Sequence, residues 1–200
     1  MQWSKQEIDA LDTQFEKSLM ARYLVHVVGD IHQPLHASSL FDDVKFPKGD
    51  MGGNMFHIKF EQGIENLHKL YDSGIARLNN NITRPLKKED NEYLEITAKA
   101  IMNEFPQESL SELNSHDFSE WIRESHDSCR DFVYKFIEYD STPTKEYIDE
   151  AYDLIRRRIS LGGYRLARLF KDIKAALDKE KNRNTELNFL EEVIQPNHFE

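Results

Sequence analysis

The uneven distribution of glycine is the feature that most limits how this chain can fold. Five of its eight glycines lie between residues 49 and 74, so the tight turns of the 200-residue chain are concentrated in one stretch. On either side of that stretch, apolar residues recur at spacings of three and four, the pattern of helices that pack against a core. The sequence therefore predicts a mainly α-helical fold with one irregular, turn-rich segment.

Four stretches carry the helical pattern: residues 5–28, about 90–101, 119–136 and 144–177. In the first stretch, the stripe expected to face the core consists of Ile8, Leu11, Phe15, Leu19, Tyr23 and Val27. Residues 55–60 alternate between apolar and polar side chains as a strand does, so we expect a short β element just after the glycine turn.

Charge and composition exclude several classes of protein. A formal net charge of −10 excludes a chain that coats nucleic acid through a basic surface, because clustered Lys and Arg are needed to displace phosphate counterions. The single cysteine, Cys129, excludes a disulfide scaffold. No apolar run approaches the ~18 residues of a membrane span, so we expect no membrane partner, and we infer no obligate protein partner.

The apolar pattern thins out near the C-terminus. Residues 1–177 are therefore expected to form one domain and residues 178–200 a polar tail. Before that boundary, residues 154–174 contain seven basic residues against one acidic residue: Arg156, Arg157, Arg158, Arg165, Arg168, Lys171 and Lys174. A charge run on a predicted helix is typical of a solvated face, and we interpret it so rather than as a phosphate-binding strip.

Two histidine–aspartate pairs have the spacing of metal ligands. His26 and Asp30 are four residues apart, as are His68 and Asp72, so on a helix each pair lies on one face, about 6 Å apart along the axis. A single such pair is more often a surface ion pair, but two pairs with a further histidine between them favour a metal centre, and these donors suit zinc. Glu65 and His68 also match the Glu-x-x-His of a di-iron bundle, which requires a second copy that the sequence lacks.

The candidate ligands divide between two sites. If residues 26–36 formed one straight helix, His26 and His36 would lie about 15 Å apart, too far to share one ion. His26 and Asp30 therefore form one pair, and a second set has three ligands, enough for a catalytic zinc: His36, His68 and Asp72. Pro34 interrupts the helical hydrogen bonding and changes the distances, but not the number of ligands. His32 has no partner at chelate spacing and is interpreted as a structural or supporting residue.

Three motifs together resemble the signature of the S1/P1 nucleases, the zinc-dependent single-strand nucleases of fungi and plants. They are LVHVVGDIHQPLH, GDMGGN and NLHKLYDSGI. Further along, Trp121–Ser125 is similar to the family's Trp-x-x-Glu-Ser helix, and Gly163–Ala167 to its Gly-x-Arg-Leu-Ala segment. The resemblance covers roughly residues 18–173 and implies a multi-helix fold of the phospholipase C/P1 nuclease type.

The resemblance also implies an activity and a cofactor. Family members are hydrolases that use three zinc ions to cleave phosphodiester bonds of single-stranded DNA and RNA, and they also remove terminal 3′-phosphates. The implied partners are single-stranded nucleic acid or nucleotides. Clustered divalent cations would supply the positive potential that a chain with a net charge of −10 otherwise lacks.

By motif, the resemblance assigns each candidate a role. Asp30 bridges the first and third zinc ions and is thereby a catalytic ligand, while His26 binds the first. The second zinc takes the set of three reached above from spacing: His36, His68 and Asp72. Asn54, in the Gly-Gly-Asn loop, is expected beside the scissile phosphate as a catalytic and substrate-binding residue, and Gly52 and Gly53 are expected to let the substrate approach.

The chain departs from the family at its start. Only 25 residues precede His26 and none is histidine, whereas the family has four further zinc ligands there. We therefore expect an N-terminally truncated chain with one well-supported zinc site. Either the full-length protein is a zinc endonuclease, or the chain is a catalytically inactive zinc-binding remnant. A phospholipase C-like esterase is a third interpretation, which the Gly-Gly-Asn loop disfavours.

Localisation follows only from the resemblance. A family member would be secreted, or held in the secretory pathway or vacuole. On that route Asn81, in the triplet Asn81-Ile82-Thr83, would be a candidate glycosylation site.

Overall fold

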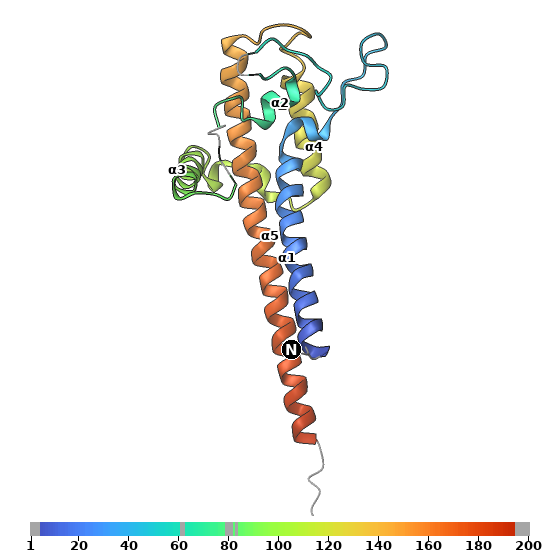
Figure 1. Ribbon diagram of the computed structural model, residues 1–200, viewed down its shortest axis with the longest axis vertical. Helices are drawn as coiled ribbons and strands as arrows, with labels where there is room; N and C mark the ends of the chain where they lie inside the picture. The colour runs from blue at the N-terminus through green and yellow to red at the C-terminus, as the bar shows by residue number, and fades with distance from the viewer. Residues whose placement is uncertain (1–4, 61–62, 79–81, 83, 195–200) are drawn as a thin grey trace, which may run out of the picture. The chain divides into compact units, whose positions relative to one another are not determined.

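The computed structural model describes residues 5–60, 63–78, 82 and 84–194, with side chains for the described residues from 14 to 180 (Figure 1). Residues Met1–Gly163 form one compact unit and Tyr164–Glu200 a second. The described elements are helices and short helical turns, which confirms the mainly α-helical fold. None of the described helices combines the length and hydrophobicity needed to cross a bilayer.

Helix α1 (Lys5–His32) confirms the first predicted helix and extends it by one turn. The prediction that its apolar stripe faces a core is wrong for Phe15 and Tyr23, which are 67% and 63% exposed. Ile8 and Leu11, from the same stripe, lie outside the residues whose side chains are described. Burial begins only at the end of the helix, where Val28 lies in the interior. Helical periodicity thus identified an apolar face but not what covers it.

The turn-rich segment follows α1 and contains the short helix η1 (Pro34–Ala37) and the six-residue helix α2 (Leu67–Asp72). The β element predicted at residues 55–60 is not confirmed. In the described chain, pairing of extended segments is limited to isolated bridges, one of which joins His57 and Asn66. The segment changes partner at each step, since Ile58 donates its amide to Glu65 and Lys59 donates to Ser141. The alternation of side chains nevertheless holds, with Phe56 and Ile58 buried.

The second half of the chain is more regularly helical. Its elements are α3 (Lys88–Glu104), the 3₁₀ turns η2 (Gln107–Ser109) and η3 (Ser111–Asn114), α4 (Phe118–Ser128), the π-helical turn η4 (Cys129–Val133) and α5 (Lys145–Ile194). Helix α4 packs against both α1 and η1, so the segment that joins them is held from one side (Figure 1). Helix α5 continues across the predicted boundary at residue 177, and the division into a domain and a tail stays a prediction.

The hydrophobic core lies beneath the turn-rich segment. Leu35 of η1 and Leu67, Leu70 and Tyr71 of α2 are almost completely buried there. They pack with apolar residues of η4 and of the first turns of α5: Cys129, Val133, Tyr147, Ile148, Ala151 and Ile155. The two short helices that carry candidate ligands are therefore fixed by their apolar sides.

The basic run on α5 is not a uniformly solvated face. Arg158 and Arg165 are buried, which makes that interpretation wrong at these two positions. Arg157 makes a double ion pair with Glu112, and Arg156 pairs with Glu104. A charge run does not show which of its members find acidic partners, so sequence alone could not identify the buried ones.

Candidate metal centre

Three predicted ligands converge at the surface of the core. His36 from η1 and His68 and Asp72 from α2 each offer a donor atom, and these atoms all lie within 4.8 Å of one another. Asp72 lies between the two imidazoles, with its Oδ1 3.6 Å from His36 Nε2 and its Oδ2 3.2 Å from His68 Nε2. Donors around a tetrahedral zinc ion are about 3.3 Å apart, given bonds of about 2 Å. We call these three residues the ligand group.

The glycine turn fixes the orientation of His68. Its Nδ1 lies 2.7 Å from the carbonyl oxygen of Gly52. Because a carbonyl oxygen only accepts hydrogen bonds, the proton must be on Nδ1, and in the neutral ring the lone pair of Nε2 points toward Asp72. This is the arrangement in which histidine binds a metal ion through Nε2.

Glycine is required at these turn positions. Gly52 has a φ of +64°, and a Cβ there would lie 2.5 Å from the carbonyl oxygen of Leu35. At Gly53, where φ is +83°, a Cβ would press at 3.2 Å on both the His68 amide and Leu35. The predicted role of both glycines in substrate approach is not tested by this geometry. What the geometry adds is that the turn packs directly against the two elements that carry the ligand group.

Gln33 holds Asp72 and was missed by sequence reasoning. Its Nε2 donates a hydrogen bond of 2.9 Å to Asp72 Oδ1, while its Oε1 accepts from the amide of Leu35 and caps η1. One side chain thus joins the start of η1 to the end of α2. The available signal was a polar residue directly before Pro34, the pattern of an N-cap followed by proline at the first position.

The hydrogen bonds of the group also shift its acid–base behaviour. When the ring is protonated, His68 donates to Asp72 through Nε2, and this hydrogen bond is the main reason that the pKa of His68 is raised, against the opposite effect of burial. For Asp72, partial burial acts to raise the pKa, but the hydrogen bonds from His68 and Gln33 outweigh it and the pKa is lowered. Asp72 is therefore a carboxylate at neutral pH, as a metal ligand must be.

The His26–Asp30 pair lies next to the ligand group. His26 Nε2 is 3.3 Å from Asp30 Oδ2, and His36 Nδ1 is 3.8 Å from the same oxygen. Residues 26–36 do not form the one straight helix for which a distance of about 15 Å was expected, because α1 ends at His32 and the chain turns at Gln33 into η1. The two predicted sites therefore remain separate sets of donors but adjoin each other at Asp30.

The other residues considered from the sequence are not members of the ligand group. Asn54 is exposed on the glycine turn, and its Nδ2 donates 2.9 Å to the carbonyl of Met51. Asn81 lies outside the described residues. Burial raises the pKa of the Cys129 thiol to about 12, so it is protonated at neutral pH and is no nucleophile.

A buried carboxylate closes the loop between η1 and the glycine turn. Asp50 accepts hydrogen bonds from the Leu40 amide at 2.9 Å and from the Tyr134 hydroxyl at 2.8 Å. Its own carbonyl accepts from Met55, across the base of the turn. Sequence reasoning did not identify Asp50, since a lone Asp in a glycine-rich loop is common at turns of every kind.

Comparisons with known proteins identify the family of the chain. A family model described as S1/P1 Nuclease matches residues 2–175. Endonuclease 4 of Arabidopsis thaliana is 27% identical over 154 residues, which cover 72% of this chain and 47% of that protein. Endonuclease 1 of the same plant is 24% identical over 183 residues, covering 80% of this chain and 52% of that protein. Nuclease S1 of Aspergillus oryzae is 33% identical over 54 residues, 27% of this chain and 16% of that protein. The chain spans about half the length of the plant proteins it matches.

Proposed function

The chain belongs to the S1/P1 nuclease family, and from this premise we propose that the full-length protein is a zinc-dependent endonuclease. It hydrolyses phosphodiester bonds in single-stranded DNA and RNA and also acts as a 3′-nucleotidase. The observation that carries the proposal is the convergence of His36, His68 and Asp72 within 4.8 Å of one another. Related proteins of plants and a fungus are named endonucleases or nuclease, which supports a nucleic-acid substrate.

The ligand group fits a zinc ion. Two imidazoles and one carboxylate are the donors of many catalytic zinc sites, which keep a further coordination position open. The tautomer of His68, set by Gly52, leaves Nε2 available, and the lowered pKa of Asp72 keeps its carboxylate ionised. A zinc ion bound there would supply Lewis-acid stabilisation for the charge on phosphoryl and leaving oxygens.

The chain's own residues hold and orient this centre. The carbonyl of Gly52 retains the proton on His68 Nδ1, and Gln33 keeps Asp72 turned toward the two imidazoles. Asn54, on the exposed side of the same turn, would bind the substrate next to the scissile phosphate. His26 and Asp30 would be ligands of the first zinc, and Asp30 would also be a ligand of the third.

The alternative function is that of a zinc-binding protein without catalysis. One observation in its favour is that the side chain of His26 is 70% exposed. Another is that the His26–Asp30 pair offers two donors, whereas a catalytic zinc needs three protein ligands. We expect the 200-residue chain alone to bind about one zinc ion tightly and to cleave single-stranded DNA little or not at all.

The two functions are separated by assaying the longest natural product of the gene on a single-stranded DNA oligonucleotide and on a nucleoside 3′-monophosphate. The endonuclease proposal expects cleavage that requires Zn²⁺, stops with EDTA and is lost in Asp72→Ala. Tight zinc binding with no cleavage of either substrate would contradict it and support the alternative. Secretion, or retention in the secretory pathway or vacuole, is proposed for the same full-length product and is tested by fractionation.

A further inference from the structure

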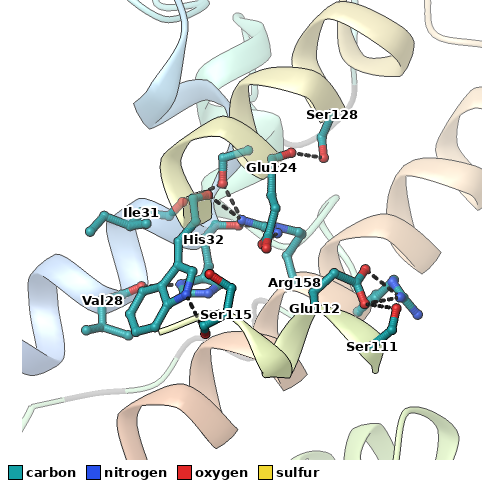
Figure 2. Close-up of polar contacts among 12 residues, drawn as sticks. Val28, Ile31, His32, Ser111, Glu112, Ser115, Glu124, Ser128 and Arg158 are labelled. Carbon is teal, nitrogen blue, oxygen red and sulfur yellow. Dashed lines mark hydrogen bonds and ion pairs between the residues drawn. The ribbon is translucent and has the colours of Figure 1, made fainter. Parts of the chain in front are cut away.

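A buried polar network fixes the end of helix α1 (Figure 2). The last four carbonyl groups of an α-helix have no partner within the helix and must be satisfied from elsewhere. In α1 these carbonyls belong to residues 29–32, the turn that contains Asp30. Gln33 and His36 follow directly, so whatever holds the last carbonyls also determines where η1 begins.

Two of these carbonyls accept hydrogen bonds from buried side chains of other helices. Ser125 of α4 donates its hydroxyl to the carbonyl of Ile31. Arg158 of α5 donates from Nε to the carbonyl of His32 at 3.2 Å. Ser125 has no exposed surface and Arg158 is only 4% exposed. Water therefore cannot replace either donor without repacking of the interior.

The guanidinium of Arg158 is held in one orientation by all three of its nitrogen atoms. Nη1 lies 2.9 Å from a carboxylate oxygen of Glu124, and Nη2 donates both to the Trp121 carbonyl and to the hydroxyl of Ser125. Ser125 thus accepts from Arg158 and donates to Ile31. The donors of a planar guanidinium point in fixed directions, so these hydrogen bonds hold Arg158 and its partners in one arrangement. The ammonium group of a lysine has no such fixed set of donors.

The two helices also hold the last turn of α1 by contact. The His32 ring lies 5.6 Å from the ring of Trp121, and its Nδ1 donates to the carbonyl of Val28 at 2.7 Å. On the α5 side, a Cβ at Gly162 would lie 3.2 Å from the His32 ring, so glycine is what lets the backbone of α5 come so near. Gly162 is one turn beyond Arg158 on the same helix.

We propose that Arg158, acting through Ser125 and paired with Glu124, is a positioning residue for the ligand group. It sets the place of Asp30 and His36, which lie on α1 and η1, relative to His68 and Asp72, which both lie on the core-anchored α2. The inference rests on the proposed function only in one respect, which is that the ligand group binds a metal ion. The hydrogen bonds from Ser125 and Arg158 to α1 go to its backbone carbonyls, so the proposed effect is on the geometry of the group.

A neighbouring ion pair provides the matched control. Arg157, the next residue of α5, makes hydrogen bonds of 2.6 and 2.8 Å to the carboxylate of Glu112. This pair joins α5 to η3 and is drawn beside the Arg158 network (Figure 2). It has the same chemistry as the Arg158–Glu124 pair, but its hydrogen bonds join α5 to η3 rather than to α1. Loss of either pair destabilises the fold, whereas only the network should change the ligand group.

The test compares Ser125→Ala and Arg158→Lys with Glu112→Gln in the full chain. Zinc affinity is measured by competition with a chromophoric chelator, and the imidazole signals of His36 and His68 are recorded by NMR in the zinc-free protein. We expect the two network variants to lose about 10-fold or more in zinc affinity and to shift the His36 signals. The zinc affinity of Glu112→Gln should stay within about twofold of the wild type, although its thermal stability falls by a similar amount. Ser125→Thr, which keeps the hydroxyl, should restore both readouts.

The outcomes separate this inference from the proposed function. If Ser125→Ala melts at lower temperature but keeps the wild-type zinc affinity and His36 signals, the network only stabilises the fold and the inference is overturned. If the wild-type chain binds no zinc, the proposed function fails, and the His36 signals of the zinc-free variants still decide the inference. Should Arg158→Lys not fold, Ser125→Ala carries the comparison alone.

Discussion

The chain uses the same His-x-x-x-Asp spacing twice, and the two copies lie in different surroundings. In both, the imidazole and the carboxylate are a little over 3 Å apart. His68 is only 16% exposed, its Nδ1 is bonded to Gly52, and its aspartate is held by Gln33. The side chain of His26 is 70% exposed, and within the described part of the chain its ion pair is with Asp30. The spacing brings a pair together, but the residues around it decide whether the pair is preorganised for a metal ion.

The largest expected effect is the loss of a donor from the preorganised copy. Asp72→Ala removes the carboxylate that lies between the two imidazoles, so zinc affinity should fall by more than about 100-fold, since removal of an outer-shell partner alone typically costs about 10- to 100-fold. Asp30→Ala, the matched change in the other copy, should cost far less at this site. Equal losses in chelator competition would show that the two copies are equivalent.

A glycine substitution tests the same contrast through the backbone. Gly52→Ala places a Cβ 2.5 Å from the Leu35 carbonyl at a φ of +64°, and we expect a loss of about 1–3 kcal/mol in the free energy of unfolding, with weaker zinc binding. Gly29→Ala is the control in α1, where a Cβ meets nothing within 4 Å. It should stabilise the chain by about 0.5–1 kcal/mol, because alanine is favoured over glycine inside a helix. Urea unfolding measures both, and a Gly52→Ala variant of wild-type stability would refute the role of this turn.

Gln33 has two functions that can be separated. In Gln33→Ala both the cap on η1 and the bond to Asp72 are lost, and zinc affinity should fall about 10-fold. Gln33→Glu keeps an oxygen to cap η1 but brings a second carboxylate against Asp72. If Gln33→Glu binds zinc as tightly as the wild type, the bond to Asp72 has no part in orienting the group.

A smaller effect is expected from pH in the zinc-free protein. The pKa of His68 is raised above its usual 6.5 by Asp72, so this stabilisation is complete below about pH 6.5 and is lost as the pH rises through the raised value. The pKa of Asp72 is below its usual 3.8, although burial acts to raise it, so its contribution is lost only as the pH falls through the lowered value.

The two shifts define a window between about pH 4 and 6.5 in which the pair stabilises the fold most. The free energy of unfolding is measured in EDTA for the wild type and for Asp72→Asn. The wild type should exceed the variant by the largest amount within this pH window. A difference that does not vary with pH would contradict the coupling between His68 and Asp72.

The sequence predicted the helical fold and the residues that converge at the candidate site better than it predicted their surroundings. Helix α1 was predicted from a spacing of three and four, which depends on local geometry alone. The exposure of Phe15 and Tyr23 could not be predicted, because periodicity does not show what a face packs against. The β element at residues 55–60 was not confirmed, for a related reason. Alternation shows which side chains are buried, but it does not show that the backbone changes its hydrogen-bond partner from one residue to the next.

At the site, the structure brings together the three residues that ligand counting had assigned to one set, His36, His68 and Asp72, and their binding of zinc stays a prediction. The contribution of Gln33 could not be derived, because it depends on a turn that brings η1 against α2 across 39 residues of sequence. Arg158 was hidden in a run of basic residues, and its burial follows from acidic and carbonyl partners on two other helices. Long-range polar contacts of this kind leave no periodic signal.

The central claim is that the two His-x-x-x-Asp copies differ in zinc binding because of their surroundings. The most direct measurement is the number of tightly bound zinc ions per chain, determined by titration for the wild type, His68→Ala and His26→Ala. The account predicts about one tight site in the wild type, none in His68→Ala and an unchanged site in His26→Ala. Three tight sites in the wild type, or a tight site that survives His68→Ala and disappears in His26→Ala, would contradict it.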